Sequence, residues 1–511
     1  MDARGAEVST GLRALGPVFR MLARVVFAVV VMLSAAVPAR AHIGNKDVFE
    51  QVSAGPYKLF ITIRTPTVIP GVAIIEVRSS GAPIDSLTIT PLLLTGEASK
   101  HPPTPDAMKR SKDDPQFFTG SLWLMGRGSW QVRFGIDGKA GAETTSVPVA
   151  AVATAILHMQ RPMGIMLGML GVILVLGIVG IVTAAVREAR LKPGAQPGEG
   201  RQQRALLAGV GALVLSCFAV YWGGKWWNVE AADYATDIHR NAELRPTIDG
   251  DRLNLLIGEP DKNADGGWRV VKNDDLLLDH GHLMHLYAIR EPEMDAVFHL
   301  HPEPTGRQGL STVLPAMPAG TYRLYGDIVF LSGFPETETA TLTVPANVSR
   351  APLGAEDASA APPPISAGDL GPADKLPDGY TMVWDKPATI IASTPYAFRF
   401  TLLDPTGKPA GDMQPYLGMA GHAAFVKTDG TTFAHTHPEG SAAMPAMMLA
   451  EESTMTMGGM NDMSGMAAGS EPVKPVVEFP YGFPSAGRYR VFVQMKHGAT
   501  VETGVFDTEV K

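Results

Sequence analysis

Two stretches of the chain, FHLHPEPT and FAHTHPEG, each place two histidines one residue apart before a Pro-Glu pair. Because side chains alternate faces along a β-strand, both imidazoles of such a pair point to the same side. A further histidine precedes the first pair by 14 residues and the second by 13. The two triads are His285, His299 and His301, and His422, His435 and His437.

Each triad predicts a metal site of its own. Neutral imidazole binds copper, zinc and nickel, and a third histidine one hairpin away from a pair gives three nitrogen ligands on one face. The alternative is a structural cluster of hydrogen-bonded histidines. His280 and His282 add density only near the first triad, so we rank them below the triads. We expect the nearby carboxylates Asp279, Glu303 and Asp327 to be solvated or at strand edges.

A methionine-rich insertion follows the second triad. Residues 440–470 read GSAAMPAMMLAEESTMTMGGMNDMSGMAAGS and hold eight of the chain's 24 methionines. Four of these recur at every third position: Met457, Met460, Met463 and Met466. Thioether sulfur is soft and selects Cu(I), so a mobile loop of this composition predicts copper ligands beside the imidazoles. The alternatives are a low-complexity loop and an adaptable apolar contact surface.

The first 41 residues carry the features of a secretory signal peptide, including an apolar stretch and an Ala-Arg-Ala cleavage site. The true start could be Met21, and an uncleaved anchor helix is the alternative. Cleavage after Ala41 would make His42 the mature terminus, whose amine and ring nitrogen can chelate copper together. A copper monooxygenase of this type also needs a second histidine, for which the residues before the first apolar run offer only His101 and His158.

Two apolar runs are long enough to cross a bilayer core of about 30 Å. They cover residues 163–186 and 205–224, and neither contains a charged residue. The basic loop 187–204 between them belongs in the cytoplasm, and tryptophans cluster at the end of the second run. We therefore expect the chain in the inner (cytoplasmic) membrane, with its other domains on the periplasmic or extracellular side. Gly164 and Gly168 offer a helix-packing face.

Outside the apolar runs, short β-strand patterns such as YKLFITIRT and YRVFVQMKH alternate with glycine and proline. A turn glycine followed by a strand recurs three times, which indicates an internal repeat. These patterns predict a mainly β protein: three Ig-like antiparallel β-sandwich domains, two transmembrane helices and an N-terminal signal helix. The expected domains are 42–155, 232–346 and 378–511. Residues 347–377, rich in proline, alanine and glycine, are expected to form a flexible linker.

Composition and missing motifs exclude several functions. The formal net charge of −8 provides no basic surface for nucleic acid. The single cysteine, Cys217, lies inside the second apolar run, so we expect neither a disulfide nor a thiolate metal site in the exported domains. The chain contains no P-loop, dinucleotide-binding, serine-hydrolase or zinc-protease motif, and we therefore expect that it is not an enzyme.

The segments DMQPYLGMAGHAAFVKTDGTTFAHTHPEG and FPYGFPSAGRYRVFVQMKHGATVETGVFDTEV resemble exported bacterial β-sandwich domains of the YtkA-like, FixH-like and CopC-like Ig type. The segment FFTGSLWLMGRGSWQVRFGIDG in the first domain also looks YtkA-like. This resemblance implies a membrane-anchored array of Ig-like domains linked to copper handling. The chain departs from the CopC-like pattern because the first domain contains no histidine pair.

These observations lead to one hypothesis and one rival. The hypothesis is an exported, membrane-anchored protein that captures, buffers or transfers copper, with the bilayer and a metal transporter, copper chaperone or oxidase assembly factor as partners. The rival is an Ig-like array for protein recognition or assembly, in which the histidines are purely structural.

Overall fold

The computed structural model of the chain describes residues 47–157, 159–192, 194–236, 238–260, 268–349, 351–455 and 472–511. Within these residues the protein is mainly β with antiparallel strand pairs, as predicted. It also contains three α-helices, two of which fall on the predicted apolar runs. The predicted signal region and His42 lie outside the described residues. The contacts discussed below all fall within Ile43–Lys511, which clusters as one unit.

Residues 48–151, here the first β unit, form two sheets around one core. One sheet has the order β1-β2-β3-β7-β6 and the other β5-β4-β8-β9. The strands are β1 (Val48–Ala54), β2 (Tyr57–Arg64), β3 (Gly71–Gly81), β4 (Ser86–Leu93), β5 (Asp106–Ala107), β6 (Lys109–Arg110), β7 (Phe117–Leu124), β8 (Gly128–Gly138) and β9 (Gly141–Ala151), and the short helix η1 is Glu97–Lys100. Alternation is plain in β2, where Leu59, Ile61 and Ile63 are buried in the shared core.

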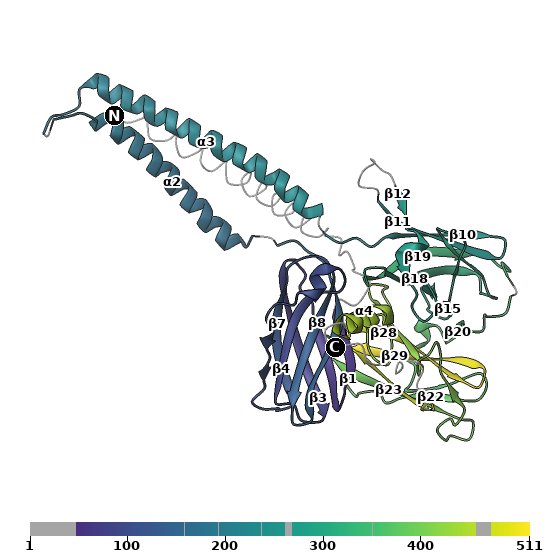
Figure 1. Cartoon of the computed structure of the whole chain (residues 1–511). Helices are drawn as coiled ribbons and strands as arrows, with labels where there is room; N and C mark the ends of the chain where they lie inside the picture. The colour runs from purple at the N-terminus through teal and green to yellow at the C-terminus, as the bar shows by residue number, and fades with distance from the viewer. Residues whose placement is uncertain are drawn as a thin grey trace, which may run out of the picture. The chain divides into compact units, whose positions relative to one another are not determined.

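Helices α2 (Arg161–Glu188) and α3 (Glu199–Thr236) lie side by side (Figure 1). Both are long and apolar enough to cross a membrane, as the two apolar runs predict. The helix-packing contact differs from the expected one. A side chain at Gly209 would collide with Thr183, so the absent Cβ lets the helices approach there, whereas Gly168 has no neighbour within 4 Å.

Residues 243–360, the second β unit, also form two sheets, β10-β11-β17-β16 with β12 beside β11, and β13-β18-β14-β15-β20 with β19 beside β18. The elements are β10 (Glu243–Asp249), β11 (Arg252–Pro260), β12 (Trp268–Val270), η2 (Asn273–Asp275), β13 (Leu276–Leu277), β14 (His285–Glu291), β15 (Val297–Leu300), β16 (Glu303–Pro304), β17 (Leu310–Val313), β18 (Gly320–Phe330), β19 (Pro335–Val344) and β20 (Ala358–Ala360).

Residues 373–510, the third β unit, repeat this plan with sheets β21-β22-β23-β27 and β24-β28-β25-β26, and with β29 beside β28. The elements are η3 (Ile365–Ala367), β21 (Ala373–Lys375), β22 (Thr381–Trp384), β23 (Tyr396–Leu403), β24 (Met413–Gln414), β25 (His422–Lys427), β26 (Phe433–Thr436), α4 (Met444–Met455), β27 (Val476–Tyr481), β28 (Gly487–His497) and β29 (Thr500–Val510).

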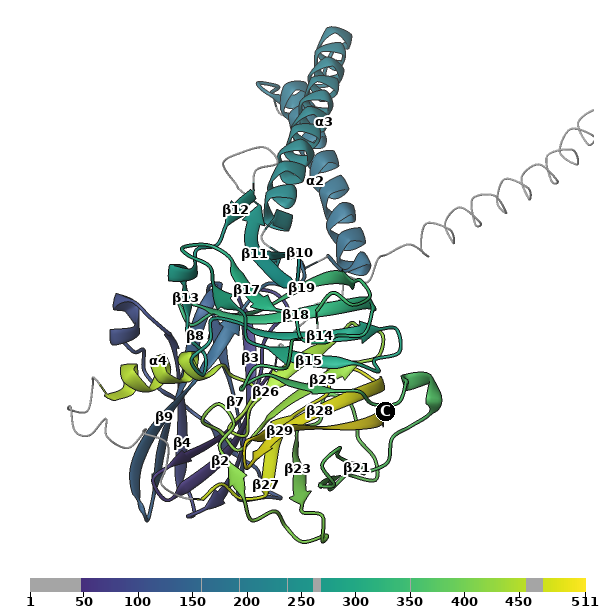
Figure 2. The same ribbon diagram turned by 90° about the vertical axis from the view of Figure 1, so that its right-hand side faces the viewer.

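The second and third β units pack sheet against sheet. Strands β14, β15 and β18 face β25, β26, β28 and β29 across a shared apolar cluster, and these strands lie next to one another in Figure 2. The rings of Tyr325 and Phe433 stack across this interface with centroids 4.2 Å apart. Arg490, fully buried, pairs with Asp507 and donates to the carbonyl of Met294 in the second unit. Each of the three guanidinium nitrogens of Arg490 donates to an acceptor, so this buried pair ties the third unit to the second.

The prediction that residues 347–377 form a flexible linker is partly wrong. Within it β20 pairs with β15, with Ala358 opposite His299, and β21 pairs with β22. The edge of β15 would otherwise leave backbone groups unpaired, and β20 satisfies them. The linker therefore also supplies residues to the histidine region.

The predicted mobile loop 440–470 begins with structure instead. Its first part forms α4, where Ala446 and Ala450 pack on Leu94 of the first β unit. Alanine, leucine, methionine and glutamate favour a helix, and docking on another unit stabilises it. Met457, Met460, Met463 and Met466 lie outside the described residues, so the prediction that they bind copper stays a prediction.

Candidate metal centre

The two predicted triads meet in one place rather than forming two separate sites. Their imidazoles lie within ring-contact distance across the interface between the second and third β units, with the ring centroids of His285 and His435 5.3 Å apart. His280 and His282, which we ranked below the triads, also belong to this group. The histidine cluster consists of His280, His282, His285, His299, His301, His422, His435 and His437.

Strand alternation explains why both triads point to the interface. In β14, His285, Tyr287 and Ile289 share one face, and Tyr287 and Ile289 belong to the apolar cluster between the units. His299 of β15 lies on the same face as Val297, and His435 of β26 lies on the same face as Phe433. The apolar side chains of these strand faces therefore pack against one another in the interface. The histidines at one end of the same faces form the cluster.

The first triad has the hydrogen bonds of metal ligands. His299 Nδ1 lies 2.7 Å from Gln494 Oε1, and His301 Nδ1 lies 3.1 Å from Asp357 Oδ1. His285 Nε2 lies 3.1 Å from the carbonyl oxygen of Asp279. In each ring we call the nitrogen that bonds this acceptor the outer nitrogen and the other one the inner nitrogen. The acceptor favours the proton on the outer nitrogen, which leaves a lone pair on the inner nitrogen, as the hydrogen-bond partners of metal-binding histidines do.

The inner nitrogens of the first triad converge. The potential ligand atoms of His285, His299 and His301 all lie within 4.8 Å of one another. His285 Nδ1 and His299 Nε2 are 3.2 Å apart. Two ligands at about 2.1 Å from one tetrahedral ion would be separated by about 3.4 Å, so this pair is already at ligand spacing.

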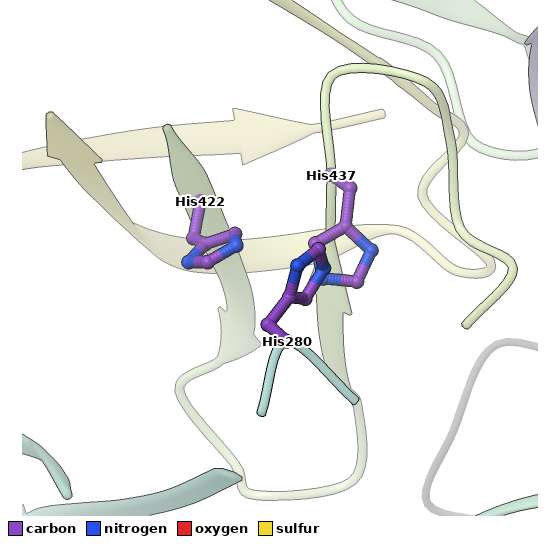
Figure 3. Close-up of side chains that lie close together, drawn as sticks. All are labelled: His280, His422 and His437. Carbon is purple, nitrogen blue, oxygen red and sulfur yellow. The ribbon is translucent and has the colours of Figure 1, made fainter. Parts of the chain in front are cut away.

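A second convergent set contains His280, His422 and His437, whose potential ligand atoms also lie within 4.8 Å of one another (Figure 3). Here the predicted triad is altered, because His280 of the second β unit joins two histidines of the third. Neither ring nitrogen of His422 or of His437 has a hydrogen-bond partner among the described residues, and the same holds for His280 Nε2. His422 is 0% exposed and His437 5% exposed, so water does not satisfy these nitrogens from the surface.

His435 lies between the two sets. Its ring centroid is 5.3 Å from that of His422 and 4.9 Å from that of His437. Its Nδ1 lies 3.2 Å from Asp327 Oδ2, while its Nε2 is buried without a partner among the described residues. His435 therefore presents a lone pair toward the cluster in the same way as the first triad.

Burial favours the neutral form of five imidazoles in the cluster. Desolvation lowers the pKa of four imidazoles well below the usual value, and repulsion between neighbouring rings lowers it further. These are His285, His299, His422 and His437. The same causes lower the pKa of His280 to about 4. At neutral pH these rings are uncharged, which is the form that binds a metal ion.

Carboxylates surround the cluster, and the prediction that Asp279, Asp327 and Glu303 are solvated or at strand edges is wrong for Asp279. Asp279 is 8% exposed, and burial raises its pKa to about 6. Asp327 contacts His435, whereas Glu303 remains exposed. Two further carboxylates were missed: Asp357 bonds His301, and Glu356 lies 2.9 Å from His282 Nε2. Negative groups around neutral imidazoles offset the charge of a bound cation.

A third group of potential ligands lies away from the cluster, at Asp378, His497 and Glu502. His497 is held between two carboxylates, 2.8 Å from Asp378 and 3.2 Å from Asp412, and its ring stacks on Tyr380. Ion pairing to these carboxylates explains the position of His497 without a metal ion.

Comparison with known proteins adds little to this description. Residues 374–511 match a family described as a domain of unknown function (DUF8832). No curated protein matches the chain. Among solved structures, the chain is similar to a 1.5-MDa bacterial ice-binding adhesin (8% identity, 86% of this chain and 91% of that chain covered, TM-score 0.13). It is also similar to a protein described as membrane anchored from Corynebacterium diphtheriae (9% identity, 91% and 96% covered, TM-score 0.15). TM-scores this low carry no argument about fold or function.

Proposed function

We propose that this protein is a membrane-anchored metal-binding protein that holds copper in the histidine cluster. One observation carries the proposal: imidazoles of two β units are buried together, and ring nitrogens of His301, His422 and His437 have no hydrogen-bond partner among the described residues. A buried polar atom without a partner costs about 1–3 kcal/mol. A metal ion would satisfy several such atoms at once.

A purely structural role accounts less well for the same contacts. In a structural histidine cluster, each ring nitrogen needs a hydrogen-bond partner. His422 has no partner for either ring nitrogen among the described residues. In the first triad, protonating either His285 Nδ1 or His299 Nε2 to join the two rings would remove the proton that bonds Asp279 or Gln494. A cation between the rings removes this conflict.

The choice of copper rests on ligand chemistry. Imidazole ligands without thiolate suit copper, zinc and nickel. Met444, the first methionine of the methionine-rich insertion, lies seven residues after His437, and the sulfur atoms of this insertion would favour Cu(I) over zinc. Nitrogen ligands in the cluster and sulfur ligands in the adjoining segment would together serve both oxidation states of copper.

The helical hairpin supports a membrane location. Because α2 and α3 pack together with a short connection, the chain would leave and re-enter the bilayer on one side. The basic loop 187–204 favours the cytoplasm for the opposite end. We therefore place the three β units, interpreted as Ig-like sandwiches of the YtkA-like, FixH-like and CopC-like kind, on the periplasmic or extracellular side of the inner membrane.

In this position the protein would capture, buffer or transfer copper, and would not need to catalyse a reaction. A metal transporter, a copper chaperone or an oxidase assembly factor would be its partner. Burial of the cluster between two units favours retention of the ion, because release requires one of the ring contacts to open.

Competitive metal titration of the full-length protein in detergent tests the proposal. We expect stoichiometric binding of Cu(I) or Cu(II), lost in the double variant His301→Ala plus His437→Ala, which removes one histidine from each convergent set. The matched control is His101→Ala, which removes a histidine with 76% side-chain exposure. Binding no stronger than the competing chelator would contradict the proposal and favour an array for protein recognition.

A further inference from the structure

The histidine cluster contains more ligands than one ion can use. A tetrahedral copper or zinc site takes four ligands, and copper in other geometries takes few more. Six of the eight imidazoles of the cluster form two convergent sets of three. His435 lies between the sets, and the ring of His282 contacts that of His301. Only the set His280, His422 and His437 draws on both β units.

The two sets differ in how their rings are held. All three rings of the first set are oriented by outer acceptors, namely a carbonyl, an amide and a carboxylate. In the second set, His422 and His437 have no such partner among the described residues. Rings fixed in advance and rings left free are two environments, so each set forms a separate coordination position with its own affinity.

The sets are nevertheless close neighbours. The ring centroid of His422 lies 6.1 Å from that of His285 and 6.2 Å from that of His299. The ring of His435 is 5.6 Å from His299 and 4.9 Å from His437. Because Asp327 binds the outer nitrogen of His435, the inner nitrogen can serve an ion in either set.

The surroundings can also offset the charge of more than one cation. Carboxylates bond or approach the outer side of the rings around the cluster, and no lysine or arginine forms an ion pair with any of them among the described contacts. These carboxylates are Asp279, Glu303, Asp327, Glu356 and Asp357. Glu303 and Glu356 are 71% and 55% exposed, whereas the side chains of Asp279, Asp327 and Asp357 are largely buried. Three largely buried carboxylates can offset more than one positive charge.

We infer that the cluster is a dinuclear copper centre shared by the second and third β units. One ion is held by His285, His299 and His301, and the other by His280, His422 and His437. His435 supplies a further ligand to the coordination shell of whichever copper ion it faces. This inference rests on the proposed function and adds the number of ions and their division between the units.

Copper stoichiometry tests the inference on the full-length protein in detergent. Cu(I) is titrated against a chromogenic chelator, and bound copper is measured after desalting. We expect two copper ions per chain in the wild type and in the control His101→Gln. His301→Gln and His437→Gln each alter one set only, and each should retain one ion, whereas the combined variant should retain none.

Paramagnetic resonance of the copper(II) form needs no variant and covers the case in which a variant fails to fold. Two neighbouring Cu(II) ions should give a broadened or coupled signal with fewer isolated spins than bound copper, and His437→Gln should restore an isolated signal.

The outcomes separate the two proposals. One ion per wild-type chain, lost in both single variants, would overturn the dinuclear centre and leave the proposed function standing. Two ions that both variants retain would place the copper elsewhere and overturn the inference. No bound copper would remove the proposed function as well.

Discussion

Asp327 and Gln494 occupy equivalent positions in the second and third β units, and each accepts a hydrogen bond from the other unit. Each is paired in strand register with the first histidine of its own triad. Gln494 bonds His299 at 2.7 Å, and Asp327 bonds His435 at 3.2 Å. The two units thus exchange the hydrogen-bond partners of His299 and His435, so neither unit orients the first histidine of its pair alone.

Removing one of these partners should weaken metal binding without touching a ligand. Replacing Gln494→Leu leaves His299 Nδ1–H without its amide acceptor, and loss of such an outer partner typically costs 10–100-fold in affinity. Gln494→Glu keeps an acceptor at this position and should retain most of the affinity. Competitive copper titration measures both variants, and equal affinities for the two would contradict a role for Gln494 in orienting His299.

Copper should also stabilise the folded protein. A ligand that binds only the folded state adds about 2.7 kcal/mol at a free concentration 100 times its Kd. Thermal unfolding in detergent should therefore shift upward with copper and return with a chelator. The variant His301→Ala plus His437→Ala, which removes one histidine from each convergent set, should show no shift, and an equal shift in that variant would place the stabilising copper outside the cluster.

Packing between the second and third β units should be as necessary for copper binding as the histidine ligands. Phe433 is fully buried and stacks on Tyr325 across the interface. Truncation to Phe433→Ala should cost about 3–5 kcal/mol of unfolding free energy and reduce copper binding although every histidine remains. The control Leu331→Ala removes an apolar side chain that is 53% exposed and should change little. Full copper affinity in Phe433→Ala would show that the centre does not depend on this interface.

A buried carboxylate links the first β unit to the chain segment after His437. Glu50 Oε1 accepts from the amide of Ala442 at 2.6 Å, whereas its Oε2 is buried without a partner among the described residues. Burial raises the pKa of Glu50 well above its ordinary value. Because the folded state then holds the proton more tightly than the unfolded chain, the contribution of Glu50 to stability falls as pH rises from about 4.3 through the folded pKa.

The variant Glu50→Gln keeps an acceptor for Ala442 and removes the charge. Its melting temperature should match that of the wild type near pH 4 and exceed it at pH 8. Thermal unfolding across this range provides the measurement. A lower melting temperature for Glu50→Gln at pH 8, or a difference that does not change with pH, would show that the ionised carboxylate is itself stabilising.

The local part of the site could be predicted from the periodicity of the sequence. His299 lies in β15 and His435 in β26, and the second histidine of each pair lies one residue beyond the strand end. Side chains two residues apart in an extended chain point the same way, and this depends only on neighbouring residues. The two apolar helices were equally predictable, because their length and lack of charge are local properties.

The meeting of the two triads could not be predicted in this way. It depends on which sheet faces which, and the packing of β14 on β25 brings together residues more than 100 positions apart. His280 lies in a turn with a positive φ of 50°, outside any periodic strand pattern. Asp357 reaches the cluster only because β20 pairs with β15, within a segment whose composition indicates a linker. The repeated His-x-His-Pro-Glu pattern was the one signal that the two units share a template.

Anomalous diffraction at the copper edge, from crystals of the copper-loaded full-length protein, tests the central claim most directly. We expect anomalous density among the imidazoles at the interface of the second and third β units, within coordination distance of His299 from one unit and His422 from the other. Density confined to the methionine-rich segment or the exposed surface, with the imidazole cluster free of metal, would contradict a copper centre built from both units.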